Sequence, residues 1–198
     1  MSDVSHAEHH STSLGIDNRK LGMWLLIASE CLLFGTLIAT FMIYRHHSVT
    51  GPTPAEVLDI PVTSISTFDL LMSSFSIVLA LHAIQQGDHK RFRRWILVTA
   101  IGGLIFLGFQ TYEFTNFVHE GLGLSTNVFG SSFYMLTGTH GTHVGVGVIW
   151  LLSLYFSSLR GKLTEDAAIK VDTMALYWHF VDVIWIVIFT VVYLFVYV

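Results

Sequence analysis

The chain has 198 residues, of which 53% are hydrophobic and 12% charged, and its formal net charge is −4 at pH 7. Its mean hydropathy of +0.62 lies far outside the range of soluble domains, so lipid must solvate most of the chain. This composition excludes a soluble catalytic domain, and we expect no nucleic-acid partner. The single cysteine, Cys31, excludes an internal disulfide and any multi-cysteine metal site built by this chain alone.

Five apolar stretches follow a polar N-terminal segment. Residues 1–20 are polar and predict a flexible tail, and residues 21–198 predict one transmembrane domain. Each apolar stretch reaches the roughly 20 residues that a helix needs to cross a hydrocarbon core. The fold class that follows is an all-α integral membrane protein, a five-transmembrane-helix bundle with spans at about 21–44, 66–86, 95–117, 129–159 and 172–198.

The basic residues predict how this bundle is oriented. Of the ten Lys and Arg residues, only Arg45 falls in a loop on the same side as the C-terminus. The positive-inside rule therefore places the N-terminus in the cytoplasm and the C-terminus outside. The basic residues on the cytoplasmic side are Arg19, Lys20, Lys90, Arg91, Arg93, Arg94, Arg160, Lys162 and Lys170.

Ionisable residues inside the spans predict layers of polar contacts, because each costs at least about 2.5 kcal/mol near the centre of a span and needs a partner or a purpose. Glu30 and His179 each lie about 15 Å along their helices from the cytoplasmic side, which predicts an inner layer. Asp182 shares a face with His179, and His82 approaches the same layer. We expect Glu30 either as a neutral acid bonded to His179 or a backbone carbonyl, or in a proton-linked or partner-facing role.

An outer layer is predicted around Glu113 and the two histidines of "GTHGTHVGVG", His140 and His143. Structural zinc needs four ligands and catalytic zinc three plus water, and only Glu113 lies at the depth of these histidines. Haem needs histidines that face each other from two helices, for which only His82 and His179 are available. The interpretation that we favour is interhelical hydrogen bonding. We therefore expect no catalytic residue, metal or cofactor in this chain.

Small and aromatic residues predict how the last two spans pack. Gly141 and Gly145 have GxxxG spacing, which lets another helix approach closely. Packing within the bundle and contact with another subunit both fit this pattern. Tyr177, Trp178 and Trp185 are expected as packing and interface anchors.

Four motifs together resemble subunit III of the haem-copper terminal oxidases (cytochrome c oxidase and quinol oxidase), in its short five-helix bacterial form. They are "SECLLFGTLIATF", "GFQTYEF", "GSSFYMLTGTHGTHVGVGVIW" and "YWHFVDVIWIVIFTVVYL". The resemblance runs in order through nearly the whole chain from about residue 20. The longer form of the family has two further N-terminal helices that build a V-shaped lipid cleft. Two alternatives remain for this chain: the cleft lies within it, or helices of the catalytic subunit complete the cleft.

The resemblance also implies roles for particular residues. Glu30 matches the membrane-embedded acid of the first span, and Glu113 the glutamate after the aromatic residue of the third. It further implies that haem and copper belong to partner subunits and that this subunit binds phospholipid. The histidine–glycine–histidine pattern and the last-helix motif are matched by His140, Gly141, His143, Trp178, His179, Phe180, Asp182 and Trp185.

The implied function is that of an accessory subunit of a proton-pumping terminal oxidase in aerobic respiration, in the bacterial cytoplasmic (inner) membrane. Such a subunit packs against catalytic subunit I near a proton-uptake path, beside subunit II, and keeps the oxidase active over many turnovers. A small subunit IV and a respiratory supercomplex are left open. The resemblance implies an oxidoreductase and translocase complex with no catalytic site in this chain.

Several alternatives stay open at this point. Gln110 in "GFQTYEF" favours cytochrome c as the electron donor, but subunit III of a quinol oxidase or of a nitric oxide reductase is also consistent. From the residues alone, a free-standing transporter or proton channel would use the same buried carboxylates. A metal or haem enzyme would use His140 and His143.

Overall fold

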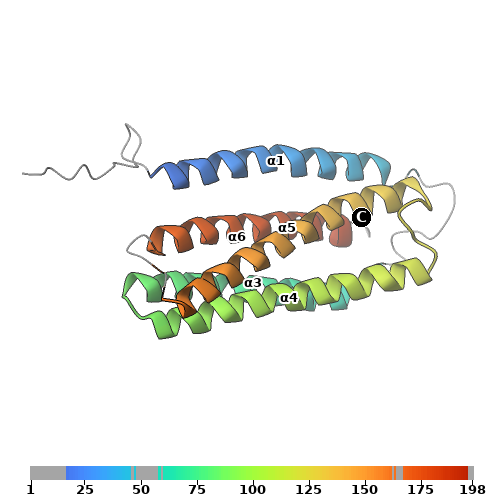
Figure 1. The fold of residues 1–198 in the computed structure, drawn as a ribbon. Coiled ribbons are helices and arrows are strands. Elements are labelled where there is room, and N and C mark those ends of the chain that lie inside the picture. Colours follow the sequence, from blue (N-terminus) through green and yellow to red (C-terminus); the bar gives the residue numbers. More distant parts are fainter. Residues whose placement is uncertain are drawn as a thin grey trace, which may run out of the picture.

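The computed structural model describes residues 17–45, 47, 58, 60–161, 163 and 167–195. Within these ranges the chain forms five long helices that run antiparallel to their neighbours along the chain (Figure 1). All five are long and apolar enough to cross a membrane, which confirms the predicted all-α five-helix architecture. They are α1 (Asn18–Tyr44), α3 (Ile60–Gln85), α4 (His89–His119), α5 (Val128–Leu159) and α6 (Ala167–Phe189), and α6 continues into the π-helix η1 (Thr190–Leu194).

The helices begin earlier than their apolar stretches because polar caps set their first turns. Asp17 accepts the backbone N–H of Arg19 at 2.8 Å, so α1 already begins within the predicted tail. Most of that tail, residues 1–16, lies outside the described residues. Asp88 likewise accepts the backbone N–H groups of the first turn of α4. Pro61, which the predicted start at residue 66 left in a loop, lies in the first turn of α3, where proline costs no hydrogen bond.

The arrangement of the helices places α6 at the centre and α1 at one side (Figure 1). The most apolar window of α6 is 56% buried inside the protein, whereas that of α1 is only 11% buried. α6 contacts α1, α3 and α5, and α3 and α4 form a close hairpin. α1 is tied to α6 at both ends, by Lys20 to Asp172 at 2.6 Å and by the Arg45 guanidinium to the Phe195 carbonyl at 3.4 Å.

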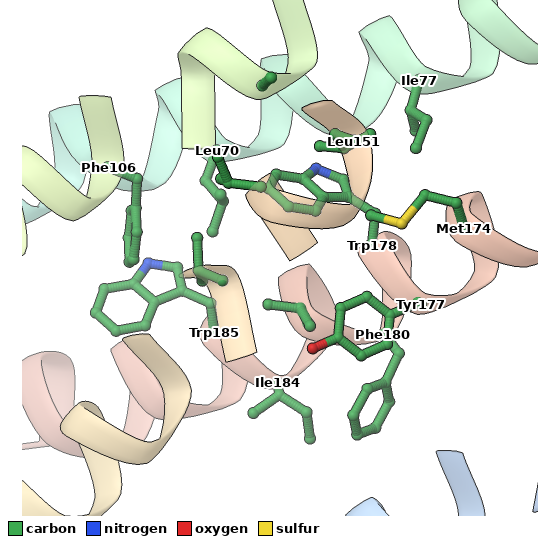
Figure 2. Close-up of a cluster of buried hydrophobic side chains, with 14 of the residues drawn as sticks. Leu70, Ile77, Phe106, Leu151, Met174, Tyr177, Trp178, Phe180, Ile184 and Trp185 are labelled. Atoms are coloured by element: carbon green, nitrogen blue, oxygen red, sulfur yellow. The ribbon is translucent and has the colours of Figure 1, made fainter. Parts of the chain in front are cut away.

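Two tryptophans of α6 fill the middle of the bundle (Figure 2). The Trp178 indole N–H donates to the Ser73 hydroxyl at 3.0 Å, and that of Trp185 donates to the Thr67 hydroxyl at 2.9 Å. Each tryptophan therefore packs in the centre and satisfies its only polar atom on α3. Because lipid gives helices no hydrophobic reason to associate, such packing and interhelical hydrogen bonds must hold the bundle together.

Glycines on either side of Trp178 make its position possible. A Cβ at Gly103 of α4 or at Gly147 of α5 would lie 2.7 Å from the Trp178 ring. The predicted GxxxG pair behaves differently. A Cβ at Gly141 would overlap the Gln110 amide of α4, whereas one at Gly145 would meet nothing within 4 Å. Of the two alternatives for the pair, packing within this chain therefore applies to Gly141, whereas Gly145 has no close helix contact among the described residues and contact with another subunit stays a prediction for it.

Candidate functional site

The polar residues of the bundle gather in separate clusters, and the first joins α1 to α5. Oε2 of Glu30 lies 3.2 Å from Nε2 of His143, and both side chains are 20% exposed. The His143 ring packs edge-on against Phe34 at a centroid distance of 5.1 Å. Tyr177 of α6 donates its hydroxyl to the His143 backbone carbonyl at 2.9 Å. The acid and the imidazole thus form an intramembrane pair held by three helices.

Hydrogen bonding at the other ring nitrogen determines the tautomer of the neutral His143 ring. Nδ1 of His143 is 2.9 Å from the Thr139 carbonyl. A carbonyl oxygen only accepts, so Nδ1 carries a hydrogen, and Nε2 of the neutral ring is an acceptor. Oε2 of Glu30 lies 3.2 Å from this nitrogen, without hydrogen-bond geometry to it or to any other described residue. A neutral acid beside a neutral imidazole and a carboxylate beside an imidazolium both have zero net charge, which suits the membrane interior.

A cavity of about 260 Å³ lies against this pair. Its walls come from α1, α5 and α6, and both members of the pair contribute to them. Its lining residues are Leu26, Glu30, Thr142, His143, Val146 and Tyr177.

This arrangement corrects the predicted layers. The prediction placed Glu30 with His179 and His143 with Glu113, but His179 lies against α3, where its Nδ1 is 2.6 Å from the Ser74 hydroxyl. Counting residues gives the height of a side chain along a straight helix but not the direction in which it points. It also overestimates the height of His143, because α5 is 32 residues long and crosses the bundle obliquely (Figure 1).

His140 is a packing residue of the core. Its side chain is fully buried, and its Nε2 lies 3.2 Å from the Val181 carbonyl of α6, to which it must donate. The rings of Trp185 and Phe106 surround it at centroid distances of 4.8 and 5.6 Å. His140 and His143 therefore serve different neighbours despite their spacing of three residues. Over the described ranges, His, Cys, Asp and Glu side chains form no group of three or more that could hold a metal ion.

A further cluster links α3 and α6. The Ser74 hydroxyl of α3 contacts two residues of α6, the His179 imidazole and the Asp182 carboxylate. Asp182 is 3% exposed, and neither of its carboxylate oxygens has a partner with hydrogen-bond geometry among the described residues. Asp182 and His179, which the sequence places on one face of the last span, thus both meet the same serine of α3. His82, predicted in the same layer, instead lies in the last turn of α3, 3.1 Å from the Gln86 amide.

Glu113 anchors a cluster at the opposite end of the bundle from most of the basic residues. The Thr63 hydroxyl of α3 donates to the Glu113 carboxylate at 2.5 Å, and the buried Tyr193 hydroxyl meets both. Tyr193 belongs to η1, and π-helical turns often occur where a helix carries a functional side chain. The sequence analysis did not single out Tyr193, because a tyrosine near the end of a span normally indicates only an interface anchor.

Asp69 of α3 is a second residue that the sequence analysis missed. It is a half-buried carboxylate within the span, and its Oδ2 is buried without a hydrogen-bond partner among the described residues. It faces α4, since Oδ2 lies 3.8 Å from the position that a Cβ of Gly102 would occupy. The sequence feature that could have identified Asp69 is its position as an isolated acid within an apolar run.

The fold and these clusters define a class: a five-span helical membrane protein with acids and imidazoles buried between its helices. The family described as cytochrome c oxidase subunit III matches residues 2–197. Quinol oxidase subunit 3 of Bacillus subtilis is 38% identical, over 96% of this chain and 97% of the relative. Cytochrome c oxidase subunit 3 of Bacillus sp. (strain PS3) is 39% identical, over 95% and 91%. Probable quinol oxidase subunit 3 of Staphylococcus saprophyticus is 40% identical, over 88% of each chain.

The chain therefore belongs to the cytochrome c oxidase subunit III family, and it is subunit III of a haem-copper terminal oxidase. This confirms the resemblance that the four motifs carry. As such a subunit it associates with the other subunits of an oxidoreductase complex. The free-standing transporter and the self-contained metal or haem enzyme are no longer needed to explain the buried carboxylates and histidines.

Proposed function

We propose that this subunit carries no redox centre and that it sustains proton uptake by the catalytic subunit, against which it packs in the bacterial inner membrane beside subunit II. The observation that carries the proposal is the 3.2 Å contact between the Glu30 carboxylate and the His143 imidazole, which lies next to a cavity. A proton can lie on the acid or on the imidazole while the net charge of the pair stays zero, which suits a group that receives and passes on protons within the membrane. Glu30 with His143, rather than with His179, is the pair to which we assign this role.

The proposed orientation places the basic end of the bundle in the cytoplasm. Every described Lys and Arg except Arg45 lies at that end. Glu30 is then about 18 Å from the cytoplasmic start of α1. In a Cys31→Ser background, we expect an impermeant maleimide to label Glu120→Cys but not Lys90→Cys in intact cells. The reverse pattern of labelling would overturn the proposed orientation.

Quinol is the electron donor that we propose for the complex. Two of the three relatives reported above are named as quinol oxidase subunits, although the cytochrome c oxidase subunit is equally similar to this chain. Gln110, the residue that favoured cytochrome c, is buried and donates its amide to the Thr137 carbonyl at 2.7 Å, so it has a packing role within the bundle. Oxygen uptake by the purified complex with a quinol and with reduced cytochrome c decides between the donors, and uptake with cytochrome c alone would refute the assignment.

The proton-uptake role is tested with Glu30→Gln in the intact oxidase. The glutamine amide can still donate to Nε2 of His143, so the contact is kept while the exchangeable proton is lost. We expect normal subunit content but slower proton uptake and earlier inactivation during turnover. Glu113→Gln is the matched control, because it neutralises a buried acid in another cluster. Proton uptake and inactivation at the parent rates in Glu30→Gln would exclude the proposed role.

A further inference from the structure

A second cavity shares no lining residue with the one beside the Glu30–His143 pair and lies near the tip of the hairpin formed by α3 and α4. It is a cleft of about 520 Å³, which is within the range of small-ligand sites. Gly87, with a φ of +73°, ends α3 and lets the chain turn directly into α4. Residues of both helices line the cleft, which therefore lies between α3 and α4. Its lining residues are Leu79, His82, Ala83, Gln86, Arg91, Arg94, Trp95 and Val98.

Two arginines give one end of this cleft an unbalanced positive charge. Both arginines interact electrostatically with the single Asp88 carboxylate, and the guanidinium of Arg91 is 3.9 Å from it. That carboxylate already accepts the backbone N–H groups of Lys90 and Arg91 as the cap of α4. Both guanidinium groups are exposed and can therefore donate to an added anion. Arginine suits phosphate in particular, because its planar fork can donate two parallel hydrogen bonds.

The other end of the cleft is apolar and lies deeper in the bundle. Along α4, Arg91, Arg94 and Val98 lie about 3, 8 and 14 Å from the start of the helix. On α3, Leu79 faces the same deep end, and the half-buried Trp95 lies between the polar and apolar parts. Trp at such a level is typical of the boundary between headgroups and acyl chains. The lining thus changes from charged side chains through an indole ring to aliphatic side chains, which matches the order of headgroup, interfacial region and acyl chain in a phospholipid.

We propose that this α3–α4 cleft is a binding site for an anionic phospholipid, whose phosphate pairs with Arg91 and Arg94 and whose acyl chain lies along Leu79 and Val98. This proposal gives one location for the lipid binding that is expected of subunit III. It rests on the proposed function only through that expectation. The lipid joins α3 to α4 at the hairpin tip.

The test uses the complete oxidase in phosphatidylcholine nanodiscs that carry a minor fraction of phosphatidylglycerol. Retained lipid is identified by native mass spectrometry. A photoactivatable phosphatidylglycerol then shows whether the peptide containing Trp95 is labelled. We expect Arg91→Gln with Arg94→Gln to lower the preference for phosphatidylglycerol by about fivefold per arginine. Lys90→Gln with Arg93→Gln is the matched control, because it removes the same charge from the same turns of α4 outside the cleft, and it should leave the preference unchanged.

A second variant keeps the proposal testable if the double arginine variant does not assemble. Val98→Trp fills the deep end of the cleft at an exposed position and leaves both arginines in place, and we expect it to abolish labelling. Equal losses in the control pair, unchanged retention in Val98→Trp, or displacement of the lipid by inorganic phosphate would each overturn the proposal. These results concern lipid retention, so they are distinguishable from the proton uptake that tests Glu30.

Discussion

A single methyl group added at Gly147 tests whether the central tryptophan holds the bundle together. In Gly147→Ala the new Cβ would lie 2.7 and 2.9 Å from two carbons of the Trp178 ring and 3.3 Å from Tyr177. These distances are well inside ordinary contact, and the ring is fully buried, so it cannot move into open space. Either the ring or the backbone of α5 must shift.

The cost of that shift has two parts. Overpacking of a filled core costs about 1–3 kcal/mol. A displaced Trp178 also loses its 3.0 Å hydrogen bond to Ser73, which is worth about 0.5–1.5 kcal/mol. We therefore expect Gly147→Ala to lower the free energy of unfolding by about 2–4 kcal/mol.

Gly145→Ala is the matched control, two residues away on the same helix. Its Cβ would meet nothing within 4 Å, and replacing a helical glycine stabilises by roughly 0.5–1 kcal/mol. The assay is unfolding of the purified chain in mild detergent by added sodium dodecyl sulfate, followed by tryptophan fluorescence. If both variants unfold at the same midpoint, the reasoning from Trp178 packing is refuted.

Three further outcomes are expected. Trp185→Phe and Thr67→Val should each lower the free energy of unfolding by roughly 0.6 kcal/mol, the average for a hydrogen bond between membrane helices. In a double-mutant cycle the two losses should be coupled, and additive losses would contradict this hydrogen bond. Lys20→Met should cost at most about 1 kcal/mol, in a salt-dependent way, because the ion pair with Asp172 is partly exposed; a salt-independent loss would argue against it. Hydrogen bonds from backbone N–H groups, chiefly that of Arg91, lower the pKa of the Asp88 carboxyl below 3.8. The carboxylate therefore stabilises the first turn of α4 above pH 3.8, and this stabilisation is lost as the pH falls through the lowered pKa. In Asp88→Asn, hydrogen exchange of that turn should no longer be sensitive to acid.

The sequence by itself determined the class of this protein. The number of spans follows from the length of each apolar run, because a helix rises by a fixed amount per residue and the hydrocarbon core has a fixed thickness. The family follows from four motifs in order, and the full-length match confirms it. The starts of three helices could also have been predicted from the local caps Asp17, Asp88 and Asn127. Hydropathy alone placed these helix starts too far along the chain.

Only the tertiary structure decided which polar residues meet. Glu30 and His143 are more than a hundred residues apart in sequence, and their contact depends on the rotation of α1 and the inclination of α5. Neither quantity is encoded in a count of residues along one helix. In a membrane both are set by side-chain packing between helices, here by the fit of Trp178 between Gly103 and Gly147, because lipid exerts no hydrophobic force that would orient a helix face.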